Sequence, residues 1–284
     1  MCSQLMNNMC YIVVDYEIEN VYSRSILVNT LVDAKLSIAD LIKSENEKFT
    51  LQNSANWKIN HYRLHKPYLK AMSIAPFLTD TIQKETKNPS ILLIGVAGAT
   101  LNNFYHEMPN EPIIIGVELD SIMVDVAEKW FGLKKSNRHK ILVEDGVKFF
   151  KDREQNAEKY DAIFVDACQT DHDDELHCPI YEFRIEDMAY HVHRSLAENG
   201  TLAINVLSLN NTISAYDKIL NVYRSYFPTC FFLSAQNGDW MNRVLVATNN
   251  PNININQEEF IRKLHENMPE IFFKSNDFKV DLIV

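Results

Sequence analysis

The segment ILLIGVAGAT, residues 91–100, decides the fold class of this 284-residue chain. Its first four residues form a short and wholly apolar run, which is typical of a strand buried on both faces of a sheet. Gly95 closes the run, and from Thr100 the sequence has the spacing of a short helix that ends before Pro109. A buried strand, a glycine turn and a helix in this order predict the first unit of a parallel α/β sheet.

Four more strand–helix units follow this segment. The predicted strands are 113–119, 140–143, 160–165 and 200–206, and the helices predicted to follow them are 121–131, 146–152, 185–196 and 212–227. Two further strands, 230–234 and 243–247, have no helix between them, so we expect an antiparallel pair at one edge. The whole pattern predicts an α/β fold with a doubly wound, mostly parallel, seven-stranded sheet.

The flanking regions have different patterns. Residues 10–16 and 25–29 are short and β-branched, residues 36–43 fit a strand or a helix, and together they predict a small N-terminal β-hairpin region. The apolar spacing of residues 68–78 predicts a helix broken at Pro76, and residues 257–268 predict an amphipathic helix. We therefore expect a β region over 1–66, a main domain over 67–250 and a C-terminal helix and tail over 251–284.

Composition excludes several classes of protein. The chain has 38 acidic and 28 basic residues, a net charge of −10, which argues against a nucleic-acid surface. No stretch has the 18 or more apolar residues of a membrane span, and the N-terminus lacks the basic start of a signal peptide. Its five cysteines, without a CxxC pair, predict neither a zinc site nor a disulfide framework. We expect a protein of a reducing compartment, the cytoplasm.

Acidic residues and a glycine follow the predicted strands at one edge of the sheet. Gly95, Glu118, Asp145 and Asp166 each stand where a strand ends. In an open parallel sheet, ligands bind outside the carboxyl ends of the strands, so these residues predict the site. Acidic residues also cap the helices that follow strands, and that structural interpretation stays open for each of them.

The turn from Gly95 to Gly98 lacks the G-x-G-x-x-G spacing that cradles a pyrophosphate. A looser G-x-x-G turn can still bring backbone amides close to a nucleoside that has no pyrophosphate. Glu118 lies 23 residues after Gly95, near the position where an acidic residue binds ribose hydroxyls. A carboxylate suits that task because it only accepts hydrogen bonds. The two features together favour a nucleoside site.

The motifs IGVAGA, VELD, EDG and FVDA, in this order, resemble those of class I S-adenosylmethionine-dependent methyltransferases. More narrowly, they resemble the branch that shares the spermidine-synthase fold. Residues 117–150, residues 160–167 and the closing DLIV at 281–284 are similar to the C-terminal half of the elongation factor 1-alpha lysine and N-terminal methyltransferases. The resemblance covers most of the chain and implies a Rossmann-like methyltransferase fold with S-adenosylmethionine as cofactor.

The resemblance also implies a role for each site residue. The turn would wrap the methionine part of the cofactor, Glu118 would hold the ribose, and Asp145 would accept a hydrogen bond from the adenine amino group. Gly146 would let the backbone close over the adenine, with Leu119 or Val147 beside it. Asp166 would lie next to the sulfonium methyl, bind the cofactor and act as the catalytic residue. The turn residues are Gly95, Val96, Ala97 and Gly98.

Two alternatives stay open beside methyl transfer. Spermidine synthases, which transfer an aminopropyl group to a polyamine, carry an acid in the glycine loop and end the fourth strand with D-S-S-D. Here residues 96–100 contain no acid, and the fourth strand is followed by Asp166-Ala-Cys-Gln169. Methyl transfer therefore ranks first. The second alternative is a catalytically impaired relative that serves as a scaffold, because Val96-Ala97 and Ala99-Thr100 stand in place of glycines in the loop.

The expected partner is a protein whose lysine or N-terminal α-amine accepts the methyl group, rather than nucleic acid or a membrane. The acidic loop Asp171–Glu175, with Glu182 beside it, would rim the site and attract a basic peptide. Its histidines and acids are too contiguous for a structural metal site, and we expect no metal. A homodimer is the assembly that we consider.

Overall fold

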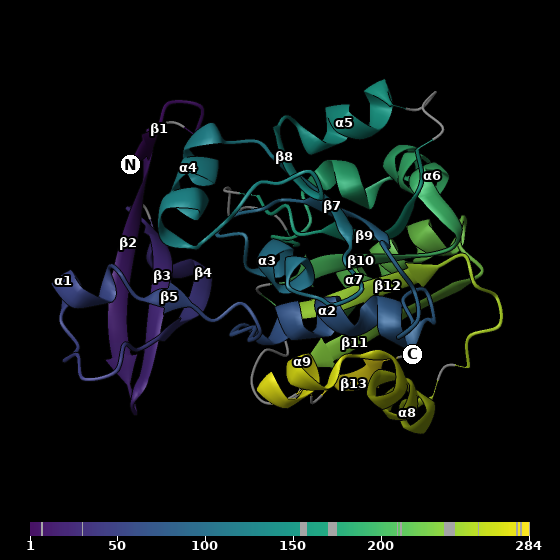
Figure 1. The fold of residues 1–284 in the computed structure, drawn as a ribbon. Helices are drawn as coiled ribbons and strands as arrows, with labels where there is room; N and C mark the ends of the chain where they lie inside the picture. The colour runs from purple at the N-terminus through teal and green to yellow at the C-terminus, as the bar shows by residue number, and fades with distance from the viewer. Residues whose placement is uncertain are drawn as a thin grey trace.

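We describe the fold from a computed structural model of the chain. The structure describes residues 1–6, 8–29, 31–153, 158–169, 175–208, 210, 212–235, 242–254, 256–276, 278 and 280–283. Within these ranges the chain forms two sheets and a set of helices (Figure 1). None of the described helices is long and apolar enough to span a membrane.

The N-terminal region forms an antiparallel sheet of five strands in chain order, so the expected hairpin was too small. The segment 36–43, which fitted strand or helix, belongs up to Ile42 to a long strand that pairs with the strand before it, Ser25 lying opposite Ile38. This pairing brings Ala39 beside the buried Ile26 in the apolar core of the small sheet. The elements are β1 (Cys2–Ser3), β2 (Met9–Ile18), β3 (Val21–Val28), β4 (Leu31–Ile42), α1 (Leu51–Ser54) and β5 (Lys58–Ile59).

The main sheet confirms the predicted α/β architecture but has eight strands rather than seven. Its order is β13-β11-β12-β10-β9-β6-β7-β8; the strands from β10 to β8 are parallel, and the remaining three are antiparallel. The additional strand lies in the tail and pairs with β11. The bounds are β6 (Ser90–Ile94), β7 (Ile113–Glu118), β8 (His139–Val143), β9 (Tyr160–Val165), β10 (Leu196–Leu207), β11 (Thr229–Ala235), β12 (Asn242–Thr248) and β13 (Val280–Ile283).

Helices cover both faces of this sheet and enclose two apolar cores. In β6, Ile91 and Leu93 face the core beneath α2, α3 and α8, while Leu92 and Ile94 face the core beneath α5, α6 and α7. This continuous apolar run is what two-sided burial requires. The helices are α2 (Pro67–Leu78), α3 (Thr100–His106), α4 (Ser121–Trp130), α5 (Gly146–Asp152), η1 (Tyr181–Arg184), α6 (Glu186–Ser195), α7 (Ile213–Arg224), α8 (Gln257–Asn267) and α9 (Glu270–Ser275).

The predicted break at Pro76 was wrong, because α2 runs through it to Leu78. Proline in a helix removes one backbone donor and crowds the preceding turn. Here the side chains from Ala71 to Leu78 are all buried against the sheet and α8. Their burial favours a continuous helix, and Pro76 comes only two residues before its end.

The small sheet is fixed to the main domain through α4, which lies beside it in Figure 1. Tyr11 and Ile26 of the sheet share an apolar core with Met123 and Phe131. Arg24 adds a polar link, because its guanidinium donates to the carbonyl oxygen of Trp130 at 2.8 Å. The small sheet is therefore held beside the carboxyl ends of the main-sheet strands, and its Tyr11 reaches them.

Two disulfides correct the expectation that the cysteines form no disulfide framework. Cys2 pairs with Cys10 directly across β1 and β2, and Cys168 pairs with Cys178. Cys230 is free and buried. The chain register brings each pair together, and no local sequence motif marks either one.

Candidate active site

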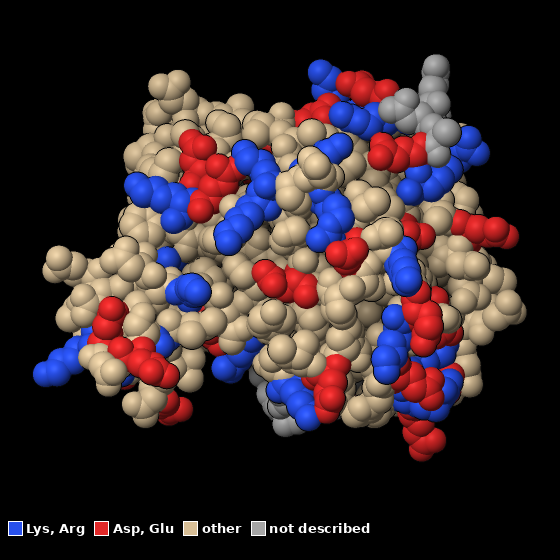
Figure 2. Space-filling model, viewed as in Figure 1, with Lys and Arg blue, Asp and Glu red and all other residues tan. Residues whose placement is uncertain are grey.

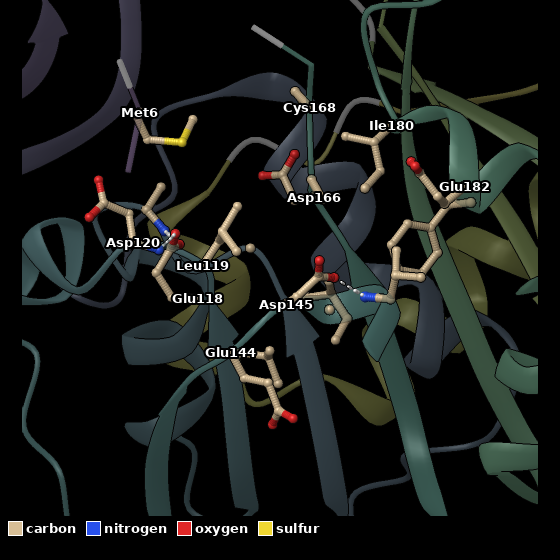
Figure 3. A pocket seen from close by; sticks show the side chains of 18 of the residues that line it. Met6, Glu118, Leu119, Asp120, Glu144, Asp145, Asp166, Cys168, Ile180 and Glu182 are labelled. Atoms are coloured by element: carbon tan, nitrogen blue, oxygen red, sulfur yellow. Dashed lines mark hydrogen bonds between the residues drawn. The ribbon is translucent and has the colours of Figure 1, made fainter. Parts of the chain in front are cut away.

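A cavity of about 320 Å³ lies outside the carboxyl ends of β6, β7, β8 and β9, where ligands bind in such sheets. Residues at these strand ends form its floor. Met6, in the turn between β1 and β2, closes one side, and Ile180 and Glu182 close the other (Figure 3). Tyr11 of β2 and Phe183 of η1 also line the cavity. Strands far apart in sequence meet here because the sheet is parallel: Ile94 lies beside both Val117 and Val165.

Gly95 is required by the close approach of two strand ends. Its φ is +85°, and a Cβ at this position would lie 2.4 Å from the carbonyl oxygen of Asp166. A larger residue would therefore separate the turn from the end of β9. The turn residues Ala97 and Ala99 also have positive φ, at +45° and +55°.

The carboxylate of Glu118 holds the turn in place. Its Oε2 accepts hydrogen bonds from the backbone amides of Val96 at 2.9 Å and Ala97 at 3.0 Å, and its Oε1 accepts one from the amide of Asp120 at 3.1 Å. An ionised carboxylate has about four acceptor positions, so Oε1 can accept another hydrogen bond from a hydroxyl in the cavity.

Asp145 caps a helix, as the structural alternative expected, and Asp120 caps another. Asp145 Oδ1 accepts from the amides of Val147 at 2.7 Å and Lys148 at 3.3 Å at the start of α5. Asp120 Oδ1 accepts from the amide of Ile122, and its Oδ2 accepts from the Tyr11 hydroxyl at 2.7 Å. Both nevertheless line the cavity, and Asp145 is exposed, so its Oδ2 remains accessible to a ligand.

Asp166 is a partly buried carboxylate of the site, and two side chains hold it in place. Its Oδ1 accepts from the side-chain amide of Asn205 at 2.7 Å, and its Oδ2 accepts from the Tyr68 hydroxyl at 3.0 Å. Burial raises the pKa of Asp166, while these two hydrogen bonds and the charge of Lys66 act to lower it. An acid held this way can accept a proton more readily than an exposed aspartate.

Sequence reasoning missed the amides that orient Asp166. Ile204 pairs with Val165, so Asn205 lies beside Asp166 at the next position. Asn242 of β12 donates to Asn205 Oδ1 at 2.7 Å, which leaves the Asn205 amino group directed at Asp166. Polar residues inside otherwise apolar strands were the available signal. Tyr68 carried no such signal, because its contact depends on how α2 crosses the sheet.

The cavity is strongly acidic. Six carboxylates line it, and none of its lining residues in the described part of the chain is a lysine or an arginine. On the face in Figure 2, acidic and basic side chains alternate, so the charge of −10 does not form one continuous field there. The local excess favours a cationic ligand. The carboxylates are Glu118, Asp120, Glu144, Asp145, Asp166 and Glu182.

Most of the predicted site residues meet in this cavity, and two do not. Val96 is buried in a small core beside α4, and Gly98 faces the small sheet, where its amide donates to Ser37 Oγ at 2.9 Å. Of the predicted acidic rim, residues 171–174 lie outside the described residues, whereas Glu182 lines the cavity. The described residues contain no cluster suited to a metal ion. The residues that meet are Gly95, Ala97, Glu118, Leu119, Asp145, Gly146 and Asp166, with Val147.

Comparisons with known proteins agree with this geometry. The profile of the spermine/spermidine synthase domain matches residues 81–257. A curated relative, the "eEF1A lysine and N-terminal methyltransferase homolog" of Drosophila pseudoobscura pseudoobscura, is 27% identical over 163 residues, which are 57% of this chain and 24% of the relative. The chain thus spans about a quarter of the length of that relative.

Solved structures share the fold. Human methyltransferase-like protein 13, in complex with SAH, aligns with a TM-score of 0.64 and 21% identity over 74% of this chain and 92% of that one. A probable spermidine synthase from Corynebacterium glutamicum aligns with a TM-score of 0.64 and 16% identity over 89% of this chain and 86% of that one. At these identities the likeness concerns the fold alone.

Proposed function

The chain belongs to the spermine/spermidine synthase domain family, and within it we propose that the protein is an S-adenosylmethionine-dependent methyltransferase acting on a protein amine. The observation that carries the proposal is the acid-lined cavity whose glycine turn has no acid of its own. The names of its curated relatives support the same class of acceptor, a lysine or an N-terminal α-amine.

The residues of the cavity fit the cofactor. Glu118 Oε1 has an acceptor position left for a ribose hydroxyl, and Asp145 Oδ2 is available for the adenine amino group. Gly146 packs closely on Ile94, since a Cβ on it would be 2.5 Å from Ile94 Cγ2, and both residues line the cavity where the adenine would lie. The cofactor would supply an activated methyl group on a positively charged sulfur, and the six carboxylates suit that charge.

Asp166 would take up the proton of the acceptor amine. An amine attacks only as the neutral base, and a lysine side chain, whose pKa in water is about 10.4, must lose a proton first. The raised pKa of Asp166 suits it to take up that proton, while Tyr68 and Asn205 hold its carboxylate in one orientation. The remaining contribution of the protein is to align the amine with the methyl group.

Aminopropyl transfer to a polyamine is the second candidate, and the family match favours it. A diamine would need a second carboxylate beside Asp166, where this chain has Cys168 and Gln169. Each lost charge-assisted hydrogen bond would cost about 1.5–3 kcal/mol. Methyl transfer needs no such second charge, so we place it first, ahead also of an inactive scaffold.

Calorimetry separates these candidates. We expect S-adenosylmethionine to bind more tightly than its decarboxylated form, and Glu118→Gln to weaken binding by roughly 10-fold or more because a charged acceptor is lost. Glu128→Gln, on the outer side of α4, is the matched control. Preference for the decarboxylated form would favour aminopropyl transfer, and binding of neither would favour the scaffold.

The acceptor is tested by transfer of labelled methyl groups from the cofactor to the proteins of a cell lysate. We expect labelled protein with the wild type and none with Asp166→Asn. Label confined to small molecules would contradict a protein acceptor, and nuclease treatment that removes the label would point to nucleic acid instead.

A cytoplasmic location and a homodimer complete the proposal. Exposed apolar side chains on the small sheet, Ile12, Ile18 and Ile42, offer a surface for a second copy. Light scattering should give twice the monomer mass of 32.9 kDa, and a monomer would contradict the dimer. Fractionation with an antibody to the protein tests the location. A protein of the cytoplasm would keep its disulfides only transiently.

A further inference from the structure

We propose that Cys168 and Cys178 form a reversible redox site that controls the candidate active site, with the disulfide as the ligand-binding form. The inference rests on the proposed function, since it concerns regulation of the same cavity. Cys168 lines that cavity and stands two residues after Asp166. Its partner Cys178 lies behind the cavity wall and is only 1% exposed.

The disulfide joins two walls of the cavity. One wall contains Asp166 and Cys168 after the end of β9, and the other contains Ile180 (Figure 3). This second wall leads from Cys178 through Ile180 to η1. Besides the disulfide, the amide of Ile180 donates to the carbonyl of Ala167 at 2.9 Å. These walls meet beside Asp166, so a change in their spacing alters the space for a ligand.

Cys178 is anchored more firmly to the main sheet than Cys168 is. The amide of Leu207, at the end of β10, donates to the carbonyl of Cys178 at 3.0 Å. Cys168 has a weak contact instead, an Asn205 side-chain amide 3.8 Å from its sulfur. The disulfide therefore ties the exposed cysteine to the firmly held one. After its reduction the side chain of Cys168 keeps only the weak contact, while the backbone on either side stays joined to the other wall through the Ile180–Ala167 hydrogen bond and through the amide of Gln169, which donates to the carbonyl of His177 at 2.9 Å.

The difference in exposure between Cys168 and Cys178 determines which sulfur an external thiolate attacks. A thiolate of an external dithiol can reach the exposed sulfur of Cys168, forming a mixed disulfide and releasing Cys178 as a thiolate that takes up a proton. The second thiol of the dithiol then displaces Cys168, so the reductant leaves as a disulfide and two electrons and two protons remain on the cysteines. A small-molecule disulfide reverses both steps and is itself reduced to two thiols.

Binding and oxidation are then linked by thermodynamics. If the disulfide form binds a ligand more tightly by some factor, the ligand must favour the disulfide over the dithiol by the same factor. Couplings between two sites in a protein are typically about 5- to 150-fold, so we expect at least about a 5-fold difference in affinity. The coupling factor can therefore be measured in two separate ways, from the ligand affinities of the two states and from the ratio of disulfide to dithiol.

The test uses SAH as the probe and the full chain in two states, oxidised and reduced by a dithiol, each verified by mass spectrometry after alkylation. We expect calorimetry to show tighter binding to the oxidised form by about 5-fold or more. We expect SAH to raise the ratio of disulfide to dithiol at Cys168 and Cys178 in a glutathione buffer by the same factor. Equal affinities in both states would overturn the proposal.

Paired variants identify the responsible cysteines. Cys168→Ser/Cys178→Ser should lose the redox dependence, and Cys2→Ser/Cys10→Ser, which lacks the other disulfide, should keep it. A dependence that follows the Cys2 pair would overturn the proposal. If no state binds SAH, the proposed function fails, and hydrogen exchange decides the redox site separately: amides of residues 176–183 must exchange faster after reduction, and unchanged exchange there would overturn it.

Discussion

The Tyr68 hydroxyl donates a hydrogen bond to Asp166 Oδ2 at 3.0 Å, although 98 residues separate the two in sequence. The contact joins α2 to the end of β9. It stabilises the charged form of Asp166, whereas burial raises the pKa of the same carboxyl. The two effects meet at the residue that we propose to receive the proton of the acceptor amine.

Tyr68→Phe tests this contact while it keeps the aromatic ring. Loss of a hydrogen bond to a charged group costs about 1.5–3 kcal/mol, so we expect methyl transfer to slow by roughly 10-fold or more. The pKa of Asp166 should rise further, which shifts the acidic limb of the pH–rate profile upward. SAH affinity should change little. The control is Tyr62→Phe, whose hydroxyl lies 3.5 Å from Glu107; an equal loss there would contradict the role of Tyr68.

Gly95→Ala tests the turn. The new Cβ would lie 2.4 Å from the carbonyl oxygen of Asp166, in a backbone conformation that costs non-glycine residues about 1–3 kcal/mol. We expect a lower free energy of unfolding and a marked loss of SAH affinity. Ala97→Gly is the matched control, because the φ of Ala97 is already +45° and glycine adopts it freely. Wild-type affinity in Gly95→Ala would show that the close approach is dispensable.

His139 makes stability depend on pH. Burial and the neighbouring His106 lower the pKa of this fully buried histidine from 6.5 to about 4. Below pH 6.5 the unfolded chain therefore binds a proton that the folded protein does not bind until about pH 4. The free energy of unfolding should fall across this window by up to about 3 kcal/mol.

Urea denaturation at a series of pH values measures this effect. His139→Gln should flatten the dependence between pH 6.5 and 4, and the exposed His265→Gln should leave it unchanged. An identical slope in the wild type and in His139→Gln would assign the pH dependence to other groups.

Arg24 and Asp15 form a buried ion pair in the small sheet. The guanidinium nitrogens lie 2.7 Å from both carboxylate oxygens, and the side chains are only 3% and 8% exposed. Arg24→Met leaves the carboxylate buried without its partner, so we expect a loss of about 3–5 kcal/mol in urea denaturation.

Two further variants check that interpretation. Replacing both residues, as Arg24→Met/Asp15→Leu, should recover part of the loss, because no unpaired charge remains. The exposed Arg262→Met, which breaks ion pairs with Glu259 and Glu266, should cost no more than about 1 kcal/mol. A similar cost for Arg24 and Arg262 would mean that burial adds nothing.

The parallel part of the sheet could be predicted because each of its strands is marked within its own sequence. Residues 160–165 and helix 146–152 agree with β9 and α5 to the residue. β13 could not be predicted this way, since four residues carry little pattern and their partner β11 lies about 45 residues earlier. Pro76 was misjudged because burial against the sheet, which outweighs the local effect of proline, is not a local property.

The candidate site also contains some residues that the local sequence identifies and others that only the fold brings into place. The residues of the strand ends, such as Glu118 and Asp166, could be identified because a parallel sheet brings its carboxyl ends together. Tyr68 and Asn242 depend on how a helix crosses the sheet and on an antiparallel register, which only the fold provides. The two disulfides likewise depend on chain register, so counting cysteines misjudged them.

The shared core between the small sheet and α4 has a consequence for synthesis of the chain. Tyr11 and Ile26 leave the ribosome before Met123 and Phe131, which cover them and come roughly 80 residues after β4 ends. At about 5–20 residues per second, the sheet waits roughly 4–16 s with an uncovered apolar face. We therefore expect chaperones to bind the nascent chain mainly during this interval, while the apolar face of the small sheet is uncovered.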